Sequence, residues 1–199
     1  LTRQQVALLA QPVEVVELKN SPTPIAKSAA EKRVHVRLHR GAVSVVPVDE
    51  LMELVEARFR EDRQRLNGPA STTTTVGPVD GFRMRYASHR EKFTQRGRRG
   101  EVIHGTGNRI STAKVLPVVD VCGDPVDEAI QDGSLFLNII RTNHPGKTDI
   151  IVWTYENSFE FTSRLKQKLH EMGYPVAVRP LPNGGHIGFS TTGTRAYAQ

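Results

Sequence analysis

The sequence predicts an α+β domain, and three observations support that class. Residues 33–66 carry the pattern of a strand hairpin followed by a helix, the middle of the chain is rich in β-branched residues, and residues 149–181 alternate strand, helix and strand. A chain of 199 residues is long enough for one well-packed domain. We therefore expect a mixed sheet of about six or seven strands, with about three helices packed largely on one face.

The first unit is a ββα arrangement. Apolar and polar residues alternate over 34–38, which is the period of a half-buried strand, and the glycine at position 41 marks a turn into a second strand at 43–46. Acidic residues in the first turn and an apolar stripe then predict a helix over 49–66. That helix ends at an Asn-Gly-Pro sequence, residues 67–69, which breaks helices.

The middle of the chain is predicted to be rich in strands. Residues 72–76 are β-branched, and apolar and basic residues alternate over 82–87. Residues 90–108 are charged and contain glycine without a clear period, which predicts a long exposed loop. A further strand is expected over 110–121, where Pro117 indicates a bulge or an edge position.

A helical segment follows and leads into the last unit. Asp124 is expected to cap it, Pro125 to occupy its first position, and Gly133 to interrupt it before residue 140. We expect no metal site at the acidic residues here, because helix capping accounts for them.

The C-terminal unit is predicted to be βαβ. Residues 149–155 form a continuous apolar strand, so Ile150–Trp153 should lie in the centre of the sheet with cover on both faces. Asn157 and Glu160 have the spacing of a capping box for the next helix. Residues 176–181 complete the unit as a strand.

These assignments predict one domain with two extensions. Residues 1–32 are expected to form a helical end and an extended arm, residues 33–181 the α+β domain, and residues 182–199 a flexible tail. No apolar run approaches the roughly 20 residues that span a bilayer, so we expect no transmembrane segment in this chain.

The positive charge is concentrated in one segment. The chain holds 27 Lys and Arg against 21 Asp and Glu, and its isoelectric point is near 9.7. Between residues 83 and 100 there are seven cations and a single acid, so this segment accounts for the whole excess. Five of these cations are the predicted site for an anionic ligand or partner, on an exposed loop: Arg90, Lys92, Arg96, Arg98 and Arg99.

No set of residues names a reaction, and we expect neither a cofactor nor a metal. The residues worth testing for catalysis are His104, Asp120, Cys122 and His144. His35 and His39 share a strand face but lie about 13 Å apart at ~3.3 Å per residue, which is too far for one metal ion. They are interpreted as exposed strand histidines. An enzyme of unrecognised type stays an open alternative.

Two segments together resemble a known family. His35–Phe59 (HVRLHRGAVSVVPVDELMELVEARF) is a hairpin running into a helix, and Lys147–Leu181 (KTDIIVWTYENSFEFTSRLKQKLHEMGYPVAVRPL) is strand, helix, strand. This order resembles the periplasmic domain of the ExbD/TolR family, the small partners of proton channels of the ExbB/TolQ type. The resemblance covers about sixty residues and departs from the family in the long insertion over 67–146 and in the C-terminal tail. It implies a periplasmic or envelope location but no functional residue, because the aspartate of the family's membrane helix has no counterpart here. The C-terminal part also resembles uncharacterised bacterial proteins.

The sequence therefore favours a non-enzymatic interaction or scaffold module. We expect it to be the soluble part of a bacterial envelope-associated protein that binds a protein partner, an anionic polymer or further copies of itself. The alternative is a cytoplasmic nucleic-acid-binding protein that uses the basic segment 83–100.

Overall fold

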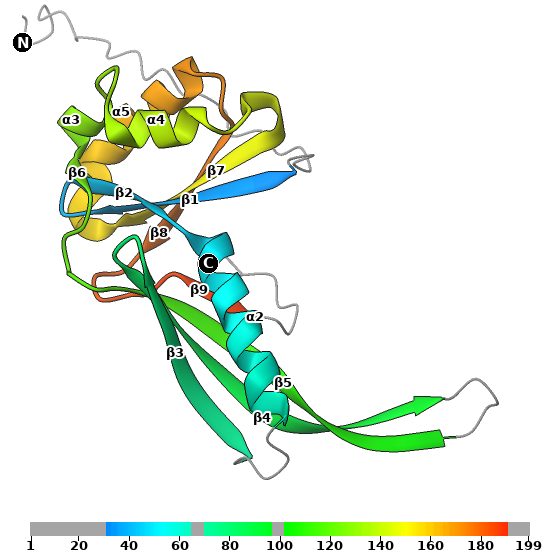
Figure 1. Ribbon diagram of the computed structural model, residues 1–199. Coiled ribbons are helices and arrows are strands. Elements are labelled where there is room, and N and C mark those ends of the chain that lie inside the picture. Colours follow the sequence, from blue (N-terminus) through cyan, green and yellow to red (C-terminus); the bar gives the residue numbers. More distant parts are fainter. Residues whose placement is uncertain (1–30, 65–69, 97–101, 191–199) are drawn as a thin grey trace, which may run out of the picture.

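The computed structural model describes residues 31–64, 70–96 and 102–190, arranged as two sheets with helices on their faces (Figure 1). The strands in these ranges are β1 (Lys32–His39), β2 (Ala42–Val46), β3 (Ser71–Val79), β4 (Phe82–Arg96), β5 (Val102–Pro117), β6 (Asp124–Pro125), β7 (Thr148–Tyr155), β8 (Val176–Leu181) and β9 (Gly188–Ser190). The helices are α2 (Val48–Gln64), α3 (Val126–Ala129), α4 (Leu135–Arg141) and α5 (Phe159–Glu171), with 3-10 turns η1 (Pro145–Lys147) and η2 (Glu156–Ser158). The fold class is α+β, as predicted.

The strands form two sheets, whereas the sequence suggested one. The first sheet is mixed and has the order β6-β2-β1-β7-β8, and the second is antiparallel with the order β3-β4-β5-β9. In the first sheet β7 runs parallel to both β1 and β8, so the expected central position of Ile150–Trp153 is confirmed. The ββα unit and the C-terminal βαβ unit are also confirmed.

One face of the first sheet is covered by the three later helices (Figure 1). Its core consists of inward residues of β1, β7 and β8, such as Val36, Val152 and Val176, with Leu137 of α4 and Leu165 of α5. Gly133 separates α3 from α4 with a φ of 90°, a conformation that glycine adopts easily, so the expected interruption is confirmed. None of the described helices combines the length and the apolar composition needed to cross a membrane.

The second sheet packs against α2. Leu51 and Val55 of the helix meet Phe82, Met84 and Tyr86, which alternate along β4, and all five side chains are buried. This second core also includes Ile151 and Trp153, which lie on the other face of β7 and pack in the same cluster as the buried residues of the second sheet. Each face of β7 therefore belongs to a different core.

Two predicted helix caps are wrong. Asp124 does not cap α3, because its backbone pairs with Val43 in strand β6 and the N-cap residue is Pro125, without a side-chain hydrogen bond. Asn157 lies inside η2 rather than at the cap of α5, and its Oδ1 accepts a hydrogen bond from the amide of Arg40. Strand pairing with β2 thus displaces Asp124 from the helix end, and a tertiary hydrogen bond uses the Asn157 oxygen that the local pattern assigned to a cap.

The expected boundaries also change. β5 ends at Pro117 rather than at residue 121. The tail expected from residue 182 contains β9, which pairs with β5, and the buried side chain of Ile187, so this part is integrated into the second core. Residues 1–30 and 191–199, which include most of the expected arm and the rest of the tail, lie outside the described residues.

Candidate functional site

The expected loop over 90–108 is instead a projecting β-ribbon. β3 pairs with β4 only as far as Ser71 and His89, whereas β4 and β5 continue to pair from Arg90 opposite Asn108 to Arg96 opposite Val102. We call residues 90–96 and 102–108 the ribbon. It extends away from the rest of the molecule in Figure 1.

One face of the ribbon is cationic. Residues opposite one another in an antiparallel pair share a face, and side chains alternate along each strand. The register therefore places eight side chains of the ribbon on one face: Arg90, Lys92, Thr94, Arg96, Val102, His104, Thr106 and Asn108. This face includes three cations and none of the acidic residues of the two ribbon segments. We call it the cationic face.

The opposite face of the ribbon is held by side-chain packing. The exposed ring of Phe93 lies over Gly105 and Gly107, and a Cβ atom at Gly105 would come within 2.4 Å of that ring. Glu91 pairs with Arg109 at 3.5 Å from Oε2 to Nη1. An aromatic side chain covering a cross-strand glycine supports a ribbon that has no core of its own.

The predicted site residues have different positions. Three of them are exposed, as predicted, but they lie in strand β4 and not on a loop: Arg90, Lys92 and Arg96. Arg98 and Arg99 lie outside the described residues. Two further cations of the basic segment, Arg83 and Arg85, are exposed on the opposite face of β4, because Met84 and Tyr86 between and after them face the core. The basic segment is thus divided between two faces.

The four residues considered for catalysis have structural contacts. Cys122 and Asp120 lie in the connection between β5 and β6, where the Asp120 carbonyl and the Cys122 sulfur both accept hydrogen bonds from Arg37. His104 Nδ1 lies 3.1 Å from Thr94 Oγ1 on the ribbon. His144 caps η1 by accepting a hydrogen bond from the amide of Gly146.

The sequence analysis missed a buried polar cluster under β1. Arg37 is only 4% exposed, lies over the ring of Tyr155, and holds the segment that contains Asp120 and Cys122 against the first sheet. His39, also buried, has a lowered pKa because of its burial and, secondly, because of the neighbouring guanidinium of Arg37. The interpretation of His39 as an exposed histidine is therefore wrong.

His35 is buried on the same face of β1 as Arg37 and His39, and we call these three residues the polar row. Its Nδ1 accepts a hydrogen bond from Trp153 Nε1 at 3.0 Å, and the ring contacts Phe189 edge to face. Burial lowers the pKa of His35 to about 4, although Asp49 acts in the opposite direction. The polar row was predicted to face solvent, because nothing in its local sequence indicates that the second sheet and the C-terminal segment cover it.

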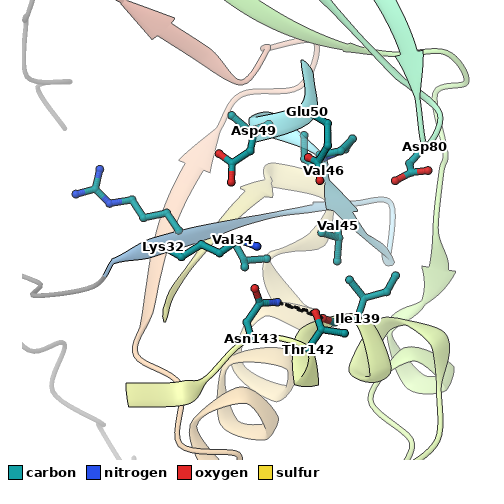
Figure 2. Close-up of a pocket in the computed structure, with 13 residues that line it drawn as sticks. Lys32, Val34, Val45, Val46, Asp49, Glu50, Asp80, Ile139, Thr142 and Asn143 are labelled. Carbon is teal, nitrogen blue, oxygen red and sulfur yellow. Dashed lines mark hydrogen bonds between the residues drawn. The ribbon is translucent and has the colours of Figure 1, made fainter. Parts of the chain in front are cut away.

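The N-terminal half of α2 carries the opposite charge to the ribbon. Asp49 and Glu50 in its first turn, together with Asp80 of the β3–β4 turn, line a pocket of about 170 Å³ beside Lys32 and Arg33 (Figure 2). Val34, Val45 and Val46 form an apolar part of the wall, and the end of α4 closes another side. The pocket therefore combines carboxylates and cations over an apolar base.

Comparison of the chain with protein-family models, with curated proteins and with solved structures finds no match.

Proposed function

We propose that the protein is a non-enzymatic interaction module that binds an acidic protein surface through the cationic face of its ribbon. The observation that carries this proposal is the ribbon itself, a two-stranded extension beyond the sheet whose charged side chains are sorted by face. An extension with little apolar surface of its own contributes little to the core, whereas it exposes its side chains on both faces and along both edges. Its location at the bacterial envelope, as the ExbD/TolR resemblance implies, is part of the same proposal.

The chemistry of the cationic face supports binding rather than catalysis. Lys92 and Arg96 lie on the same face and are exposed, so they can form ion pairs with carboxylates of a partner without a large desolvation cost. Such contacts are individually weak, and they act mainly on the rate and the orientation of docking. A row of them along one face of the ribbon would fix the direction in which a partner binds.

Binding to poly-L-glutamate at low salt tests this function. We expect the double variant Lys92→Gln/Arg96→Gln to bind more weakly, by up to about thirtyfold, since two ion pairs at up to about 1 kcal/mol each are lost. The matched control is Arg83→Gln/Arg85→Gln, which removes the same charge from the other face of the same strand and should bind like the wild type. Equal losses in the two variants would mean that net charge, and not the cationic face, governs binding.

A nucleic acid is the second candidate partner, and a specific observation favours it. The major groove of B-form DNA admits a two-stranded β-ribbon, and the cationic face carries Arg, Lys, Thr and Asn side chains that can hydrogen-bond to bases or phosphates. The three cations of this face predict a slope of about −3 for log K against log salt. Binding of a 20-base-pair duplex that persists at physiological salt, with that slope and with loss in the Lys92/Arg96 variant, would select this candidate over an acidic protein.

A further inference from the structure

We propose that the acidic surface bound by the ribbon belongs to a second copy of this protein, so that copies associate head to tail. The cationic face of one copy lies against the N-terminal half of α2 in the next. This inference rests on the proposed function, because it names the partner of the cationic face.

The N-terminal half of α2 is a matching surface of opposite charge. Residues 48–57 contain four carboxylates and no cation, and all four are exposed: Asp49, Glu50, Glu53 and Glu56. The exposed carboxylate of Asp80 extends this surface at the neighbouring turn. We call these five residues the acidic surface. Within the described part of the chain, Glu56 forms an ion pair along the helix, at 3.7 Å from its Oε2 to Arg60 Nη2.

The two surfaces have comparable lengths. Lys92 and Arg96 are four residues apart in a strand, which is about 13 Å, and Glu50 and Glu56 are six residues apart in a helix, which is about 9 Å. The long side chains of Lys and Arg can adjust by several ångströms, so at least two ion pairs can form at once. The apolar stem of each cation can also cover Leu54, an exposed side chain of the same helix half.

The surfaces cannot meet within one molecule. Gly77, before the β3–β4 turn, lies next to Leu51 near the start of α2, whereas Tyr86 further along β4 donates a hydrogen bond to Asp62 near the end of α2. β4 therefore runs along the helix from its N-terminal to its C-terminal half, and the ribbon continues beyond it, as Figure 1 shows. The cationic face and the acidic surface lie at opposite ends of this path, so their pairing needs a second copy.

Pairing of two different surfaces is a heterologous contact. Such a contact closes into a ring or grows into an open chain, instead of stopping at a symmetric dimer. It is also electrostatic and solvent-exposed, so salt weakens it, since the Debye length falls from about 30 Å at 0.01 M salt to about 3 Å at 1 M.

Analytical ultracentrifugation of the whole chain tests this inference. At about 0.01 M salt the weight-average mass should rise with protein concentration past the dimer, and at about 1 M salt it should return to that of the monomer. A wild-type protein that stays monomeric at low salt overturns the inference. If that monomeric protein still binds poly-L-glutamate through Lys92 and Arg96, the proposed function stands. If it binds neither a second copy nor poly-L-glutamate, the inference and the proposed function both fail.

A charge exchange identifies the surfaces. Lys92→Glu/Arg96→Glu leaves the cationic face with a net charge of −1, and Glu50→Lys/Glu53→Lys/Glu56→Lys leaves the acidic surface with a net charge of +1. Each variant should be monomeric alone, because it has the same charge sign on both surfaces. When they are mixed in equal amounts, association should return, since every ribbon then has a surface of opposite charge available. Arg83→Glu/Arg85→Glu is the matched control and should associate like the wild type.

Three results of the mixing experiment contradict the head-to-tail contact. The first is that either variant associates alone. The second is that the mixture does not associate although both variants melt like the wild type. The third is that the control variant no longer associates. All substituted side chains are exposed, so we expect thermal unfolding of every variant to resemble that of the wild type. If the wild type at low salt binds duplex DNA more tightly than it binds a second copy of itself, the cationic face is assigned to nucleic acid instead.

Discussion

The polar row of β1 has an unusual position for its residue types. His35, Arg37 and His39 alternate with Val36 and Leu38, yet both sets are buried because a core or a covering segment lies on each side of the strand. Histidine and arginine in such a place need hydrogen-bond partners, and Trp153 and the Asp120 carbonyl supply two of them. A neutral histidine satisfies this requirement more easily than a charged one.

This burial predicts that acid weakens the fold through His35. The pKa of His35 is lowered to about 4 in the folded state against 6.5 in the unfolded state, so the unfolded chain binds the proton first as the pH falls. The stabilising effect of the neutral ring is complete above pH 6.5 and is lost between pH 6.5 and about 4. At 1.36 kcal/mol per pKa unit the loss is about 3 kcal/mol.

Urea denaturation at several pH values measures this effect. The free energy of unfolding of the wild type should fall more steeply between pH 6.5 and 4 than that of His35→Gln, whose amide oxygen can accept the same hydrogen bond from Trp153. His144→Gln is the control, because His144 is exposed, and it should keep the wild-type slope. Equal slopes for His35→Gln and the wild type would contradict a buried neutral His35.

At the scale of single elements, the strands and helices with a local hydrophobic pattern were predictable. β7 is a continuous apolar run, and α5 and β8 each have a local apolar pattern, so their positions follow from the sequence alone. The ribbon has no such period, since its stability comes from cross-strand pairing and from Phe93 over Gly105. The three cations of the candidate site could therefore be selected by charge, but their common face appears only when the register of β4 and β5 is known.

The central strand gives a prediction at this scale. Ile151 is 7% exposed and lies in the second core, so Ile151→Asp buries a carboxylate and should lower the free energy of unfolding by about 3 kcal/mol or more. Val178→Asp is the matched control, because Val178 is opposite Val152 on the edge strand β8 and is 38% exposed. We expect its cost in urea denaturation to be much smaller. Similar midpoints for the two variants would argue against burial of both faces of β7.

The arrangement of the whole molecule depends on contacts that no local pattern encodes. The two sheets meet through the C-terminal segment, in which the amide of Val115 donates to the Ile187 carbonyl and the Tyr155 hydroxyl donates to the Gly185 carbonyl. These residues belong to different sheets and are far apart in the chain. Composition and glycine content predicted a mobile tail at this position, whereas tertiary packing makes it a connection between the sheets.

Removal of this segment should therefore weaken both sheets. A chain ending at Leu181 lacks the buried side chain of Ile187, together with Phe189, which contacts His35, and it should unfold with a free energy lower by about 3 kcal/mol or more. Trp153 is the only tryptophan and its hydrogen-bond partner His35 loses this cover, so its fluorescence should shift to longer wavelength in the folded state. A chain ending at Ser190 keeps β9 and is the control with which the shorter chain is compared. If the chain ending at Leu181 kept the emission maximum and the midpoint of the control, the C-terminal segment would not contribute to the second core, and the polar row of β1 would need another cover.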